Sequence, residues 1–145
     1  MRLQNGTFVL VSDAAKALLL QNRGDEHQMD LRVLEALSED SLPNREQAAD
    51  KPGRFATPDG GRAATEATDW QEVGEDRFLA EVAARTLKAV SGQSPALLVV
   101  AADPRSLGKL RPRLVDSGSI VLVAEINRDF VHQTIPQIES ALIEA

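Results

Sequence analysis

The sequence predicts an α/β domain built on one mixed sheet, with helices on both of its faces. Two apolar runs, residues 7–12 and the uninterrupted 96–102, are typical of strands that are buried on both faces. Three strand-like segments come first, and helix-like and strand-like segments alternate after them. A meander of strands followed by two crossover units predicts the strand order 3-2-1-4-5, with the second strand antiparallel to its neighbours.

The N-terminal part is predicted to form the three strands of the meander. Residues 7–12 are rich in residues that favour strands. Residues 16–21 form a short apolar segment followed by the turn-forming sequence 22–25, which favours a strand over a helix. Residues 29–34 alternate apolar and polar side chains, as a half-buried strand does.

A polar segment over about 40–70 separates the meander from the rest of the chain. It contains three prolines and three glycines, at positions 43, 52, 53, 58, 60 and 61. These residues break regular structure or permit unusual backbone conformations. We therefore expect a long polar loop within a single domain of residues 1–145, since connections of this length are usually functional or disordered.

A long helix is predicted after this segment. Thr68 and Gln71 have the spacing of a capping box, which places the start of the helix near Thr68. Apolar residues recur at helical spacing from Phe78 to Val90, and Glu81 and Arg85 form an i,i+4 pair on another side. Trp70 is expected to pack at the start of this helix.

The C-terminal part is predicted to contain two strands, each followed by a helix. Residues 96–102 form the fourth strand, and Asp103 and Pro104 have the residue types of an N-cap and a first helical position. Pro112 predicts a kink or an early end of that helix near Arg111. Residues 120–124 form the last strand, and a final helix starts at residues 134–137.

This order of elements is that of a ribonuclease H-like three-layer sandwich. The similarity is one of architecture, and an architecture does not carry a function by itself.

Composition excludes several functional classes. The 145 residues carry a net charge of −6, which argues against bulk, non-specific binding of nucleic acid but leaves room for a local basic patch. The chain has no Cys, so disulfides and thiolate metal sites are excluded. No signal-peptide core and no apolar run of membrane-spanning length is present, so we expect a cytoplasmic protein.

Several stretches, in the same order along the chain, resemble the bacterial host-attachment protein family. They are Val11-Ser-Asp-Ala-Ala-Lys-Ala17, Asp50-Lys-Pro-Gly-Arg54, Gly60-Gly-Arg62, Asp76-Arg-Phe-Leu-Ala80, Ala101-Ala-Asp-Pro-Arg-Ser-Leu-Gly-Lys-Leu-Arg111 and Asn127-Arg-Asp-Phe-Val-His132. The name of that family refers to attachment of bacteria to host cells, and it implies no known biochemical activity.

That family in turn resembles the central domain of archaeal and eukaryotic class-one peptide release factors. The resemblance implies a ribonuclease H-like fold with a Gly-Gly-Gln loop before its long helix. In release factors this loop enters the peptidyl-transferase centre and positions a water molecule. Here Gly60, Gly61 and Arg62 occupy the place of that loop, with Arg54 upstream. A permanent cation thus replaces the neutral amide, which argues against hydrolysis of peptidyl-tRNA.

A row of cations provides a second candidate binding surface. Arg105, Lys109 and Arg113 recur every four residues and would form one stripe on a helix. Together with the loop arginines, this basic stripe would suit contact with phosphate or RNA. The alternative is an ordinary solvated helix face. Only 3% of residues are aromatic, so base stacking has little support.

Asp13 and Asp103 are weak candidates for a metal site, because they follow two strands that are predicted to be adjacent and parallel. A ribonuclease H-type site would need further carboxylates, of which Glu35 and Asp129 are available. Asp103 as an N-cap and Asp13 as a turn residue are the competing explanations. His27 and His132 have no metal-binding spacing, and no nucleophilic triad is present. We therefore predict no metal, no cofactor and no catalytic residues.

The functional interpretation favours a binding module over an enzyme. The first hypothesis is a non-catalytic module whose Gly-Gly-Arg segment and basic stripe contact the ribosome or RNA. The second is an enzyme, either a peptidyl-tRNA hydrolase or a metal-dependent nuclease. The third is a protein-interaction factor that acts in host attachment.

Overall fold

The computed structural model describes the backbone of residues 1–41 and 60–145, and the side chains of residues 1–40 and 70–145. The strands are β1 (Phe8–Ser12), β2 (Lys16–Asn22), β3 (Leu31–Ser38), β4 (Ala96–Ala102) and β5 (Ile120–Ile126). The helices are η1 (Glu39–Ser41), α2 (Gly60–Ala89), α3 (Pro104–Val115) and α4 (Ile135–Glu144).

The five strands form one sheet in the order β3-β2-β1-β4-β5, as the sequence predicted. Strand β2 is antiparallel to both β1 and β3, whereas β1 is parallel to β4 and β4 is parallel to β5. The two apolar runs lie side by side at the centre of the sheet, where Phe8 pairs with Leu98 and Ser12 pairs with Ala102. The architecture is the mixed α/β sandwich expected from the order of elements.

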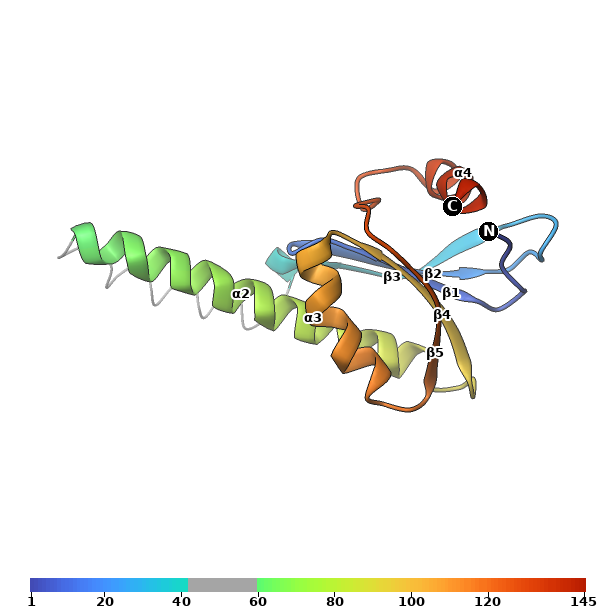
Figure 1. Cartoon of the computed structure of the whole chain (residues 1–145), viewed down its shortest axis with the longest axis horizontal. Coiled ribbons are helices and arrows are strands. Elements are labelled where there is room, and N and C mark those ends of the chain that lie inside the picture. The colour runs from blue at the N-terminus through green and yellow to red at the C-terminus, as the bar shows by residue number, and fades with distance from the viewer. Residues whose placement is uncertain (42–59) are drawn as a thin grey trace.

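The helices cover both faces of the sheet (Figure 1). On one face α2 and α3 pack on the sheet, and Phe78, Leu107 and Leu110 join Leu98 of β4 in the core. On the other face, Ile138 and Leu142 of α4 pack against Val9 and Val99. Both central strands are therefore buried on both sides, which explains why all of their side chains except that of Ser12 are apolar.

Two helix boundaries differ from the prediction. Helix α2 begins at Gly60 and not at Thr68, so the predicted loop over 40–70 is helical from Gly60 onward, and residues 42–59 lie outside the described residues. Residues 63–67 include three alanines and a glutamate, which are strong helix formers, and this propensity outweighs the capping signal.

Pro112 lies inside α3, which continues to Val115, so the early end near Arg111 that was one of the two predicted effects of this proline is not found. A proline removes the hydrogen bond to the carbonyl four residues earlier, here that of Gly108. Both Pro112 and Gly108 are exposed, so solvent can satisfy that carbonyl and the helix continues. Within the described residues, no helix is long and apolar enough to cross a membrane.

Candidate functional site

The candidate site lies beyond the carboxyl ends of the central strands β1 and β4. Ser12 and Ala102 are paired at the ends of β1 and β4, so Asp13 and Asp103 follow neighbouring parallel strands, as predicted. Ligands in sheets of this kind gather beyond the carboxyl ends of the strands. We call this region the carboxyl edge.

Asp13 is fixed in the turn that joins β1 to β2. Its Oδ1 atom accepts hydrogen bonds from the backbone amides of Ala15, at 2.8 Å, and Lys16, at 2.6 Å. Its other oxygen, Oδ2, lies 3.5 Å from Nε2 of His132. The Asp13 side chain is 21% exposed and that of His132 is 65% exposed, so the pair lies at the surface with the carboxylate partly enclosed.

Asp129 completes a group of three side chains at this edge. Its Oδ1 atom accepts a 3.0 Å hydrogen bond from the amide of Val131, which holds the carboxylate in the connection between β5 and α4. One ligand atom from each of Asp13, Asp129 and His132 lies within 4.8 Å of the other two. We call these three residues the Asp-Asp-His cluster.

The structure confirms the prediction that Asp103 is the N-cap of α3, and it groups Asp13 with other residues than Asp103. Asp13 meets Asp129 and His132, while Asp103 caps α3 by accepting a 3.1 Å hydrogen bond from the amide of Ser106. The sequence around His132 has no metal-binding spacing, so it does not indicate this residue as a ligand. The signal that could have identified it is topological, since the connection after β5 returns to the edge where β1 ends.

Glu35 forms an ion pair away from the Asp-Asp-His cluster, and Ser106 is buried. Glu35 accepts a 3.3 Å hydrogen bond from Arg85, which also donates to Glu81 at 2.9 Å, as the predicted i,i+4 pair. The hydrogen bond to Glu81, and then that to Glu35, raises the pKa of Arg85 above its ordinary value. The hydroxyl of Ser106 is buried and has no hydrogen-bond partner among the described residues.

A shallow hollow of about 240 Å³ lies beside the Asp-Asp-His cluster. Its lining comes from the start of β2, the end of β3 and the residue that precedes His132: Lys16, Ala17, Leu18, Ala36, Leu37, Ser38 and Val131. Most of these side chains are apolar, so the hollow would contact the nonpolar part of a bound molecule.

The basic stripe packs against an acidic row on α2. Arg105 forms ion pairs with Glu75 at 3.3 Å and with Glu72 at 3.5 Å, and Lys109 forms an ion pair with Asp76. Arg113 is exposed and forms no ion pair with the side chains that the structure describes. Two of the three cations of the stripe are thus already paired within the protein, and among the described side chains Arg113 has no such partner.

The Gly-Gly-Arg segment lies at the far end of α2. Gly60, Gly61 and Arg62 form the first turn of the helix, which extends well beyond the sheet (Figure 1). Farther along α2, Trp70 is 46% exposed, so the packing role expected for it is not what the structure shows. Arg54 lies outside the described residues.

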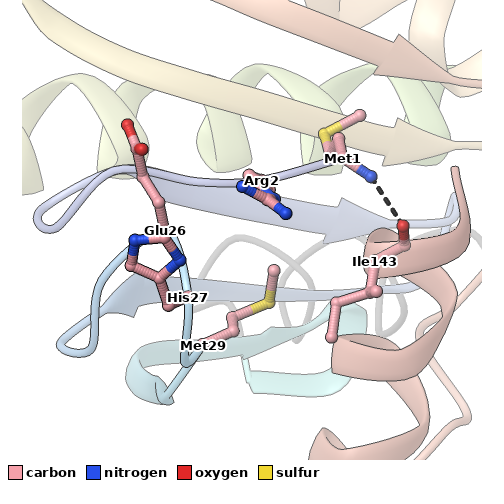
Figure 2. Close-up of a pocket in the computed structure, with 6 residues that line it drawn as sticks. All are labelled: Met1, Arg2, Glu26, His27, Met29 and Ile143. Carbon is pink, nitrogen blue, oxygen red and sulfur yellow. Dashed lines mark hydrogen bonds between the residues drawn. The ribbon is translucent and has the colours of Figure 1, made fainter.

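A second hollow, of about 460 Å³, lies at the other end of the strands, between the start of the chain, the β2–β3 connection and α4 (Figure 2). It is lined by Met1, Arg2, Glu26, His27, Met29 and Ile143. The ammonium group of Met1 donates hydrogen bonds to the carbonyls of Leu142, at 2.7 Å, and Ile143, at 2.8 Å, at the C-terminal end of α4. A positive group at the C-terminal end of a helix is stabilising, so this contact contributes to the stability of α4.

Comparison with known protein families identifies the family of this chain. A model of the bacterial archaeo-eukaryotic release factor family 12 matches residues 6–142, which include all five strands and all of the described helices except the last two residues of α4. No curated protein matches the chain.

Proposed function

Because the chain belongs to bacterial archaeo-eukaryotic release factor family 12, we propose that it is a non-catalytic binding module that contacts the ribosome or RNA. The contact is made by the Gly-Gly-Arg end of α2, with Arg54 upstream of it. Arg113, and then the other cations of the basic stripe, provide secondary contacts with phosphate.

The observation that carries this proposal is the projection of α2. The helix places Gly60, Gly61 and Arg62 at its far end, away from the sheet (Figure 1). A projecting helix that begins with two glycines can carry its tip into a recess of a large partner, because glycine lets another backbone approach closely. Trp70 and Val73, exposed on the same helix, would add apolar contact area.

The residue that follows the glycines supports binding without catalysis. An arginine side chain has only hydrogen-bond donors and stays charged, whereas a glutamine amide offers both a donor and an acceptor to water. Arg62 therefore suits contact with a phosphate and does not suit the positioning of a water molecule. Two of the carboxylates that a nuclease of this fold would need are engaged elsewhere, since Asp103 caps α3 and Glu35 pairs with Arg85.

The direct test is sedimentation of the protein with purified ribosomes at several salt concentrations. We expect binding that weakens as salt rises, and Arg62→Glu and Arg113→Glu each to lower the slope of log affinity against log salt by about one. Arg2→Glu changes charge equally but lies at the opposite edge of the sheet, and it should leave binding unchanged. Equal binding by the wild type and the Arg62→Glu variant would reject the proposal.

The same preparations distinguish binding from catalysis. Ribosomal complexes that carry a labelled peptide should retain the peptide, and the RNA should remain intact after incubation with the protein. Release of peptide above the buffer control would support the alternative of a peptidyl-tRNA hydrolase. Cofractionation with another protein in place of ribosomes would favour the interaction factor suggested by the resemblance to host-attachment proteins.

A further inference from the structure

We propose that the Asp-Asp-His cluster is a binding site for a divalent transition-metal ion of the Zn²⁺ type. The site goes beyond the proposed partner contact, because it lies at the carboxyl edge and not at the end of α2. Its ligands are one oxygen each of Asp13 and Asp129 and Nε2 of His132, which come from two connections far apart in the sequence.

The first support is the spacing of the ligand atoms. The 3.5 Å between Asp13 Oδ2 and His132 Nε2 is long for a hydrogen bond, which normally spans about 2.7–3.2 Å. Zinc bonds to nitrogen and oxygen of about 2.1 Å in a tetrahedral site place neighbouring ligand atoms about 3.4 Å apart. The separations within the cluster, at most 4.8 Å, need only small side-chain rotations to close around one ion.

The second support is the way both carboxylates are held. Oδ1 of Asp13 accepts two backbone hydrogen bonds, and Oδ1 of Asp129 accepts one, so in each residue one oxygen is anchored and the other remains for a ligand. Hydrogen bonds of this kind orient the carboxylates that bind metal ions.

The third support is charge. Two carboxylates lie close together, and within the described residues neither forms an ion pair with a lysine or an arginine. Among the described residues, Asp13 pairs with the imidazole of His132, which carries a charge only when it is protonated. A divalent cation would balance both negative charges and bind the neutral imidazole as well.

The ligand types select the class of ion. Imidazole with carboxylates suits Zn²⁺, Co²⁺ or Mn²⁺, whereas Mg²⁺ and Ca²⁺ prefer a set made of oxygen atoms. Three protein ligands leave one tetrahedral position open to water or to a group from a bound molecule. The hollow that is lined by the ends of β2 and β3 also includes Val131, the residue that precedes His132.

The test is titration of the purified protein with ZnCl₂, followed by calorimetry and by NMR of the histidine side chains. We expect one ion per chain and a shift of the His132 signals. Only two histidines are present, so His27 serves as an internal reference whose signals should stay in place.

His132→Ala and Asp129→Asn should each weaken binding about tenfold or more, since even the loss of a supporting hydrogen bond costs 10–100-fold in affinity. His27→Ala is the matched control and should bind as the wild type does. Both ligand residues are exposed, so circular dichroism should show intact folding in both variants. Absence of binding at millimolar Zn²⁺, or equal binding by His132→Ala and the wild type, would overturn the proposal.

Discussion

The backbone amide of Leu31, the first residue of β3, donates a 2.8 Å hydrogen bond to the carboxylate of Glu139 on α4. Strand β3 lies at one edge of the sheet, whereas α4 lies on one of its faces. The bond therefore fastens the last helix to the start of an edge strand. It also satisfies an amide that belongs to a buried residue, which is costly to leave without a partner.

Replacing Glu139 with alanine should destabilise the protein by about 1–2 kcal/mol, because the Leu31 amide would lose a charged acceptor. Urea titration monitored by circular dichroism would measure the change in the free energy of unfolding. Glu144→Ala removes an exposed carboxylate from the same helix and should change stability by less than about 0.5 kcal/mol. A similar decrease in the free energy of unfolding in both variants would show that the hydrogen bond to Leu31 does not contribute to stability.

Asn22→Ala should cost about 2–4 kcal/mol, because the buried Asn22 amide satisfies three backbone groups. It donates to the carbonyl of Leu3 at 2.9 Å, and it accepts from the amides of Gly24 and Asp30, both at 3.0 Å. Asn5→Ala is the control, since the Asn5 amide also bonds to backbone carbonyls but is exposed. Thermal unfolding should show a clear loss for Asn22→Ala and little change for Asn5→Ala.

Gly24→Ala should destabilise the β2–β3 turn strongly, whereas Gly108→Ala should stabilise α3. A Cβ atom at position 24 would lie 1.9 Å from the carbonyl oxygen of Gln28, so the backbone would have to move. A Cβ atom at position 108 would meet nothing within 4 Å, and alanine favours a helix by about 0.5–1 kcal/mol over glycine. Opposite shifts in melting temperature are expected, and a loss in both variants would contradict the account of Gly108.

Leu98→Ala should cost about 2–5 kcal/mol, because Leu98 is fully buried at the centre of the sheet and its loss leaves a cavity. Val121 on the edge strand β5 is 47% exposed, and Val121→Ala should cost less than about 1 kcal/mol. Denaturant titration of the two variants compares a central strand with an edge strand. A loss below about 1 kcal/mol for Leu98→Ala would be inconsistent with this core.

Asp25 should make stability depend on acid pH. Hydrogen bonds from the amides of Gln28, first, and His27 lower the pKa of Asp25 below its ordinary value of 3.8. The Asp25 carboxylate therefore binds protons more readily in the unfolded state than in the folded state. Its contribution to stability is present above about pH 4 and is lost as the pH falls through the pKa that Asp25 has in the folded protein. In Asp25→Asn this part of the acid dependence should disappear. NMR titration of the Asp25 carboxyl checks the direction, which a midpoint at or above 3.8 would contradict.

The strands and their order could be predicted from the sequence because both depend on local patterns and simple connection rules. The apolar run of β4 fixed its bounds, and Asp103 with Pro104 fixed the start of α3. The start of α2 could not be found in the same way, because a capping-box pattern at Thr68 competed with helix propensity spread over several earlier residues.

The candidate site was harder to predict, because it depends on contacts between distant segments. The sequence indicates that Asp13 and Asp103 share an edge and that Asp103 caps α3, but it does not show that Asp129 and His132 lie beside Asp13. Pairing of Arg105 with Glu75 is equally invisible in a helical wheel of α3, since the partner belongs to α2. Two residues of the basic stripe, Arg105 and Lys109, therefore form ion pairs between α3 and α2.

The pairing of Phe8 with Leu98 has a consequence for the way the chain folds. Strands β1, β2 and β3 are joined by short turns and can assemble early, but β1 meets β4 only after the chain has closed a loop that includes α2. Until then, one side of β1 presents unpaired backbone groups and fully apolar side chains. Such an open strand is a template for association between chains, so the period before β4 docks is when this protein is most prone to aggregate during refolding.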